Sequence, residues 1–418
     1  MKLRLFIVFA CACSFVLNVI GQSDLREDIF EEGAPTVNGI TIPMVEDNFL
    51  KELIGDDRVT LHTYMGLFYG NDDNVSLDED DANASTYLTE LYGGRIGFEI
   101  PETLTLQVDS YYKTKEYFNV DNNEKMNDYF LKGAIGYTPT DSLELNFAAG
   151  THKQTTYIDD LLGLSNVETI TNTYSTGLTL DITEKVYTTL QWDTQYVNYA
   201  EVGNTILQYR KNTGTAGMYY RVSAKTNVGL EVISGRVSYE SVNGNSRKTA
   251  DFTDYGISTS TTCNKLSLNT FAGFTDWNFG SGNLTEDDND VKRFIGTADL
   301  TYTISDHFST LLSVEHGPRL SNSGDSNFYI YDRVGLTFVY IPVVQLQLTS
   351  TIYHEEIDKA SSTNDYDYDK DAINLAATYS LTEYTGIGAS YEYSQKHADT
   401  QNSDYDRNMF TVGMWMSF

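Results

Sequence analysis

The chain has little of what builds most soluble proteins or helical membrane proteins. It contains 3 cysteines and 6 prolines in 418 residues, and its 28 Lys and Arg are far outnumbered by 59 Asp and Glu. The net charge of −31 argues against a nucleic-acid partner, because an acidic surface repels phosphates. Two cysteines, Cys11 and Cys13, lie within the first 21 residues, which we interpret below as a cleaved signal peptide. Cys263 is then the one cysteine of the mature chain, so neither an intramolecular disulfide nor a thiolate metal site is expected.

Residues 1–21 have the features of a secretory signal peptide. Lys2 and Arg4 precede an apolar run, Leu5–Ile20, that ends in small residues suited to cleavage. An amino-terminal anchor and a lipoprotein signal at Cys11 are the alternatives. No later apolar stretch reaches the ~20 residues that a membrane-spanning helix needs, so the chain is expected to be exported without helical spans.

Aromatic residues are abundant in a chain that is polar on average. They make up 13% of the residues, with 31 tyrosines, while the mean hydropathy is −0.35. Apolar and polar side chains alternate in many stretches. Near the middle of the chain, for example, one side of an extended strand carries Leu266, Leu268, Ala272 and Phe274, and the other carries Ser267, Asn269 and Gly273. This period of two predicts strands with one apolar and one polar face.

From Arg58 onward two long alternating strands joined by a short turn are followed by a longer polar loop, and this unit repeats. The short turns are expected at Ile100–Glu102, Pro139–Asp141, Thr183–Lys185, Lys225–Asn227, Cys263–Lys265, Ser305–His307, Ile341–Val343 and Thr382–Tyr384. They predict an all-β fold, a single transmembrane antiparallel up-and-down β-barrel over 58–418 with about 18 strands, or 16 as the alternative. A soluble sandwich also alternates, but its strands are usually shorter, about 5 to 6 residues.

The last stretch of the chain has one apolar side. That side carries Phe410, Val412, Met414, Met416 and Phe418. An alternating strand that ends on an aromatic residue looks like the closing strand of a bacterial outer-membrane barrel, whose carboxyl-terminal signature is read by the barrel assembly machinery. The alternative is an edge strand of a soluble sheet.

Residues 22–57 precede the regular pattern and contain one short helix candidate. Asp47 is suited to cap its start and Gly55 to end it. We expect a periplasmic amino-terminal segment that tucks against or into the barrel mouth. A disordered tail is the alternative.

The expected first strand ends in a recognisable run of residues. Its members are Gly66, Tyr69, Asp72, Asp73 and Asn74. The run resembles the opening strand of the β-barrel porin 2 family, although Gly70-Asn71 is inserted relative to the commoner spacing. The resemblance implies a barrel in the outer membrane of a Gram-negative bacterium. It also implies a link to exopolysaccharide export, because some members lie in exopolysaccharide gene clusters.

Charged residues on the polar side of each strand are candidates for lining a pore. The acids sorted to this side are Glu99, Asp109, Glu144, Asp181, Asp193, Glu231, Asp254, Asp299, Glu315, Glu355 and Glu392. The bases are Arg95, Lys132, Arg221, Arg293, Arg333 and Lys396, whereas Asp332 falls on the lipid side. This acidic excess predicts a weak preference for cations, because rings of acidic side chains favour cations in a pore.

These features leave three classes of function. We expect a porin-like transport channel for hydrophilic solutes, with outer-membrane lipid, lipopolysaccharide and polysaccharide as partners; the oligomeric state is left open. A plugged structural or adhesive barrel is the second class. A lipid-modifying enzyme is the third, and it is disfavoured because the chain has no Gly-x-Ser-x-Gly or His-Glu-x-x-His motif.

Acidic loops raise the question of metal binding. Clusters such as 78–81 and 286–290 supply the hard oxygen ligands that Ca²⁺ and Mg²⁺ prefer, but none has the spacing of a defined calcium loop. Solvated loops without a bound cofactor are therefore the expected state, and divalent cations bridging to lipopolysaccharide phosphates are the alternative.

Overall fold

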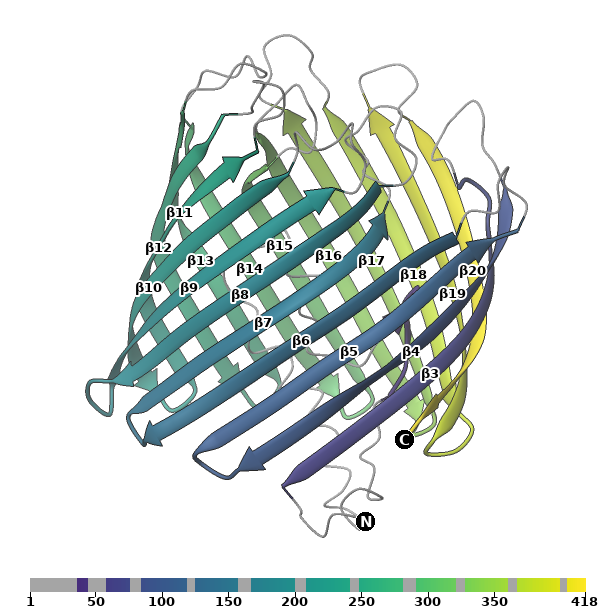
Figure 1. Cartoon of the computed structure of the whole chain (residues 1–418), viewed down its shortest axis with the longest axis horizontal. Helices are drawn as coiled ribbons and strands as arrows, with labels where there is room; N and C mark the ends of the chain where they lie inside the picture. Colours follow the sequence, from purple (N-terminus) through teal and green to yellow (C-terminus); the bar gives the residue numbers. More distant parts are fainter. Residues whose placement is uncertain are drawn as a thin grey trace.

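The protein forms a closed barrel of 18 antiparallel strands, with a small two-stranded hairpin in addition (Figure 1). The computed structural model describes residues 36–43, 58–75, 84–118, 125–156, 167–199, 208–240, 248–280, 291–320, 328–359, 367–398 and 404–418. The predicted all-β barrel and its strand number are confirmed. Among the described residues, no helix is long and apolar enough to span a membrane.

Long strands of similar length make up the barrel. The hairpin consists of β1 (Thr36–Val37) and β2 (Ile40–Thr41). The barrel strands are β3 (Val59–Asp72), β4 (Ser85–Ile100), β5 (Leu104–Tyr117), β6 (Lys125–Thr140), β7 (Leu143–Thr156), β8 (Val167–Asp181), β9 (Val186–Tyr199), β10 (Tyr209–Ser223), β11 (Thr226–Tyr239), β12 (Ala250–Cys263), β13 (Leu266–Phe279), β14 (Val291–Ser305), β15 (Phe308–Leu320), β16 (Phe328–Val343), β17 (Leu346–Lys359), β18 (Tyr368–Ser380), β19 (Thr385–Ala398) and β20 (Tyr405–Ser417).

Each strand pairs with its neighbours in sequence, and the first barrel strand pairs with the last. The eight short turns fall at or next to the predicted positions, all at one end of the barrel, which we call the turn end. The longer connections lie at the other end, the loop end (Figure 1). Purple β3 lies beside yellow β20 in the figure, and their register runs from Met409 opposite Asp72 to Ser417 opposite Tyr64. We call this junction the closing seam.

The two faces of the wall differ in exposure, as the alternation predicts. On β3, Met65, Leu67 and Tyr69 are 43–51% exposed and point outward, whereas Tyr64 and Phe68 are at most 8% exposed and point inward. Pairing carries this sidedness from strand to strand, since directly opposite residues share a face. The outer face is rich in exposed Leu, Ile, Val, Met and aromatic side chains, and such an apolar band suits lipid contact.

Aromatic residues near the loop end occupy both faces. The outward set includes Tyr112, Trp192, Tyr255, Phe274, Phe294 and Phe410, each 44–53% exposed. Tyr111, Tyr199 and Trp277 also lie near the loop end, yet the register turns them inward. Strand parity, rather than distance from a loop, decides whether such a ring meets lipid.

The hairpin lies inside the barrel. Asn38 and Gly39 form its two-residue turn with φ of 49° and 81°, as a type I′ turn requires. Its apolar side chains pack against inward residues of the wall. Within the expected periplasmic segment 22–57, the structure describes residues 36–43, which include this hairpin. The predicted helix 47–55 lies outside the described residues.

Candidate functional site

The structure places every candidate pore-lining charge on the inner face of the barrel. These residues are Arg95, Asp109, Lys132, Glu144, Asp193, Glu231, Asp299, Arg333 and Glu392. Asp332 points outward, where it contacts His316. That the inner residues line a conducting path stays a prediction.

Some of these candidates come together across neighbouring strands. Arg95, Asp109 and Lys132 lie in one row across β4, β5 and β6. Arg95 donates to Asp109, whose second oxygen accepts from Gln107 Nε2 at 2.6 Å. Arg333 lies 3.6 Å from Glu355 on β17. Such pairing holds charged groups against the wall and reduces their field in the lumen.

The inner face also carries charges that were not among the sequence candidates. The additional bases are Lys113, Lys115, Lys211, Arg319, Lys370 and Arg407, and the additional acids are Asp72 and Asp128. Together with the sorted residues they bring inward acids and bases to nearly equal numbers in the described part of the chain. The predicted acidic excess of the wall is therefore wrong for these residues.

The inward charges are not spread evenly along the barrel axis. Acids predominate next to the turn end, where Glu99, Glu144 and Asp181 lie within two residues of their strand ends, together with one base, Arg221, which pairs with Asp181. Bases predominate near the loop end: Arg293, Arg319, Lys370, Lys396 and Arg407. Among the described inward residues, acids are thus in excess next to the turn end and bases are in excess near the loop end.

A polar and aromatic cluster lies on β9, β10 and β11. The rings of Tyr187 and Tyr219 stack with centroids 4.9 Å apart, and the Arg221 guanidinium lies 4.6 Å from the Tyr187 ring centre. Tyr219 donates its hydroxyl hydrogen to Glu231 Oε2 at 2.6 Å, and Ser258 donates to the same oxygen at 2.9 Å. Glu231 is 5% exposed, so these donors satisfy a carboxylate that is almost withdrawn from solvent.

The residues of the family-like run meet at the closing seam. Asp72 is fully buried and accepts from Arg407 Nε of β20 at 2.9 Å, with a second bond from the same guanidinium. Tyr117 also donates to Asp72, at 3.0 Å. The Asp72 carboxylate therefore ties β3 to both β20 and β5.

The two residues that follow continue the same contact. Asp73 accepts from the backbone N–H and the side-chain amide of Asn408, at 2.6 and 2.8 Å. Asn74 donates to the Asp406 carbonyl at 3.0 Å. Gly66 faces inward and Tyr69 outward. The acidic residues of the run thus join the first and last strands, which their position in sequence alone did not indicate.

The carboxyl-terminal strand presents its apolar side to the outside. Its outward residues are Phe410, Val412, Met414, Met416 and Phe418, which are 37–60% exposed. The last residue also takes part in closure, because Phe418 and Thr63 exchange backbone hydrogen bonds of 2.7 and 2.8 Å. Its recognition by assembly machinery stays a prediction.

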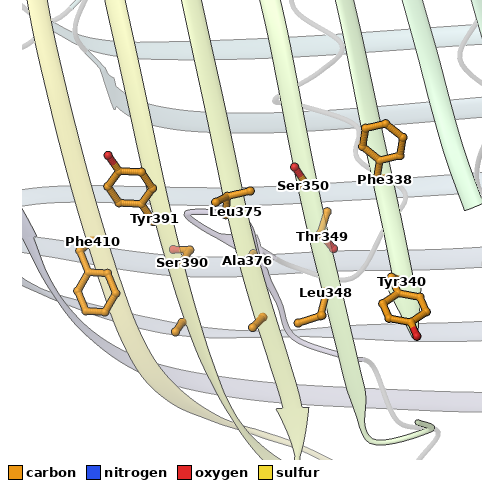
Figure 2. A pocket seen from close by; sticks show the side chains of 12 residues that line it. Phe338, Tyr340, Leu348, Thr349, Ser350, Leu375, Ala376, Ser390, Tyr391 and Phe410 are labelled. Carbon is orange, nitrogen blue, oxygen red and sulfur yellow. The ribbon is translucent and has the colours of Figure 1, made fainter. Parts of the chain in front are cut away.

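A depression of about 420 Å³ lies on the outer wall of β16–β20. Figure 2 shows the side chains that line it. Phe338, Tyr340, Tyr391 and Phe410 surround it, and Leu348, Leu375 and small Ala and Ser side chains form its floor. Because the rings and Leu side chains of this lining belong to the outward face, the depression is part of the surface that suits lipid contact.

Comparison with known proteins finds matches among solved structures, at low sequence identity. No protein-family model and no curated protein matches the chain. Among solved structures, OccK5 (OpdH) of Pseudomonas aeruginosa has a TM-score of 0.46 at 10% identity, with 87% of this chain and 99% of that chain covered. OccK2 (OpdF) of the same organism gives 0.49 at 10%, covering 86% and 98%. The FrpB iron transporter of Neisseria meningitidis (F3-3 variant) gives 0.47 at 12%, covering 88% and 67%. The resemblance to β-barrel porin 2 stays a prediction.

The six histidines do not assemble into one site. His62 and His152 face inward on β3 and β7, and His307 lies in a turn. The outward three each lie near an aspartate: the pairs are His316 with Asp332 at 2.7 Å, His354 with Asp371 at 2.9 Å and His397 with Asp404 at 3.8 Å. Across the described ranges, no group of three or more His, Cys, Asp or Glu side chains is arranged to hold a metal ion. The acidic clusters 78–81 and 286–290 lie outside those ranges.

Sequence reasoning missed two features of the lumen. The first is the hairpin, for which Val37-Asn38-Gly39-Ile40 is a recognisable signal, since Asn-Gly between apolar residues favours a type I′ turn. The second is the set of bases near the loop end, such as Lys115 and Arg407. These bases lie near strand ends, where the alternation of apolar and polar side chains, which assigns a residue to one face, becomes less regular.

Proposed function

We propose that the protein is a channel for hydrophilic solutes in the outer membrane of a Gram-negative bacterium. The observation that carries this is the contrast between an apolar outer wall and an inner wall on which charged side chains recur from β3 to β20. Barrels of 16 to 18 strands are wide enough to leave an aqueous channel. The lumen would be polar but nearly balanced in charge, which suits small solutes of either sign or none.

Solute uptake by proteoliposomes tests this function. Purified protein reconstituted into liposomes is expected to let small neutral sugars enter and swell the vesicles, with a rate that falls as sugar size increases. Heat-unfolded protein is the matched control. If folded barrels leave vesicles as tight as protein-free ones, the plugged structural barrel replaces the channel, and lipid turnover in the same vesicles would instead support an enzyme.

We further propose that the turn end and both termini face the periplasm, as short turns do in barrels of this kind. An epitope inserted at Asp288, between β13 and β14, should bind antibody on intact cells, and one at Asn264, in the turn between β12 and β13, should bind only after permeabilisation. The reverse pattern would invert the orientation.

Exopolysaccharide is a finer proposal for the cargo. Inward stacked rings support it, because aromatic faces offer large apolar contact areas to the C–H faces of sugars. Tyr187 with Tyr219 is one such stack, and Tyr111 with Phe130, 5.4 Å apart, is another. Added polysaccharide should interrupt channel currents, and Tyr219→Ala should weaken that block; currents indifferent to polysaccharide would remove this cargo.

A further inference from the structure

The amino-terminal hairpin packs on an apolar patch of the inner face at the closing seam. Val37, Ile40 and Ile42 are 0–4% exposed. The wall residues packed against them are Tyr64, Phe68, Leu91 and Trp415, from β3, β4 and β20. Without the hairpin these apolar side chains would face the lumen. Residues 36–43 therefore have a defined place on the wall.

A polar contact at the hairpin tip bridges the two sides of the seam. Asn38 Nδ2 donates to Tyr87 OH on β4 and to Thr411 Oγ1 on β20, each at 2.9 Å. Tyr87 and Thr411 also bond to each other at 2.6 Å, and both are fully buried. One side chain thus contacts strands from opposite ends of the barrel sequence.

Glycines leave the space that the hairpin occupies. A Cβ on Gly388 of β19 would collide with Ile40 Cγ2, and one on Gly66 of β3 would collide with Phe68 and lie 3.3 Å from Ile42 Cδ1. A Cβ on Gly39 would collide with Asn374 of β18. Glycines in the hairpin and in the wall thus both allow the close approach, as expected for a specific packing contact.

We propose that residues 36–43 are a resident constriction, which narrows the lumen along the seam wall and sets the largest solute that passes. This rests on the proposed channel function. A hairpin fixed on the inner wall removes its own volume from the path. Its buried apolar residues and its bridging Asn38 oppose release, since release would expose apolar surface and break hydrogen bonds.

Disulfide trapping tests the packing of the hairpin on the seam independently of transport. In a chain with Cys11, Cys13 and Cys263 replaced by Ser, the pair Asn38→Cys with Thr411→Cys should form a cross-link on mild oxidation in the folded barrel. The matched control pairs Asn38→Cys with Thr213→Cys, an inward, buried position on β10. Cross-linking of the control as readily as the seam pair, or of neither pair, would overturn the seating of the hairpin.

Channel size tests the constriction. Gly388→Val should push Ile40 off the wall, and deletion of residues 36–43 should remove the obstacle altogether. Both are expected to raise single-channel conductance and admit larger sugars than the unaltered protein. Gly335→Ala is the control, because its inward Cβ would meet Tyr353 at an ordinary 3.8 Å. Unchanged conductance in folded barrels of both variants would refute the constriction, whereas a silent unaltered protein would refute the channel and leave the cross-linking result standing.

Discussion

The closing seam and the junction between β12 and β13 use the same antiparallel ladder but are held together differently. A two-residue turn joins β12 to β13, and the two strands are paired along their whole length, beginning with Cys263 opposite Leu266 next to the turn. No connection joins β20 to β3, and the other barrel strands separate them in sequence. A short connection keeps its strands near each other at little entropic cost, and the seam lacks this help.

At the closing seam, side-chain contacts hold together two strands that no turn connects. Buried Asp72 pairs with Arg407 at the loop end, Asn38 bridges Tyr87 and Thr411 farther down, and Phe418 completes the ladder at the turn end. Contacts at β12–β13, such as Thr275 donating to Asp254, supplement a covalent link. Ion pairs and buried amides are therefore expected to contribute most to holding two strands together where no turn connects those strands.

The largest effect should come from removing the buried acid at the seam. Asp72→Ala leaves the mostly buried Arg407 without its carboxylate, and losing one partner of a buried ion pair costs about 3–5 kcal/mol. Urea unfolding in detergent micelles measures this loss. Asp251→Ala is the control, because its ion pair with Arg236 is outward and exposed. Equal losses in the two variants would refute a special role for the seam pair.

A smaller effect is expected from deleting Phe418. The deletion removes two backbone hydrogen bonds with Thr63, which together contribute about 1–3 kcal/mol, and a ring stacked on Tyr384. The yield of folded protein in the outer membrane should fall more than on deletion of residues 22–32. Matching yields would mean that the last residue does not help to close the barrel.

The smallest effect should follow from Asn74→Ala. The change removes the hydrogen bond that this side chain, 1% exposed, donates to the Asp406 carbonyl, and the loss of such a bond costs about 1 kcal/mol. The temperature at which the barrel unfolds in detergent should decrease slightly. Asn278→Ala, at an outward exposed amide, should leave that temperature unchanged; a larger decrease in the control would contradict the comparison.

Much of the wall could be predicted because alternation and turn chemistry are local. A strand such as Leu266–Phe279 shows which side is apolar, and turns such as Pro139–Asp141 show where strands end. Strand number and the inward position of Asp109 or Glu231 follow from these signals.

Closure and the position of the hairpin on the inner wall could not be predicted in this way, because they depend on contacts between residues far apart in sequence. Nothing near Asp72 indicates Arg407 as its partner, and nothing near Asn38 indicates Thr411. The apolar inner residue Trp415 also breaks the rule that lumen-facing positions are polar, and the reason is the hairpin packed over it.

Single-channel recording of the purified barrel in planar bilayers under a KCl gradient tests the central claim most directly, that the closed wall surrounds a hydrophilic path. We expect steady currents with a small reversal potential, because inward acids and bases nearly balance. We also expect unequal currents at opposite voltages, because acids lie toward the turn end and bases toward the loop end. Protein that remains folded in the bilayer yet carries no current would contradict the account.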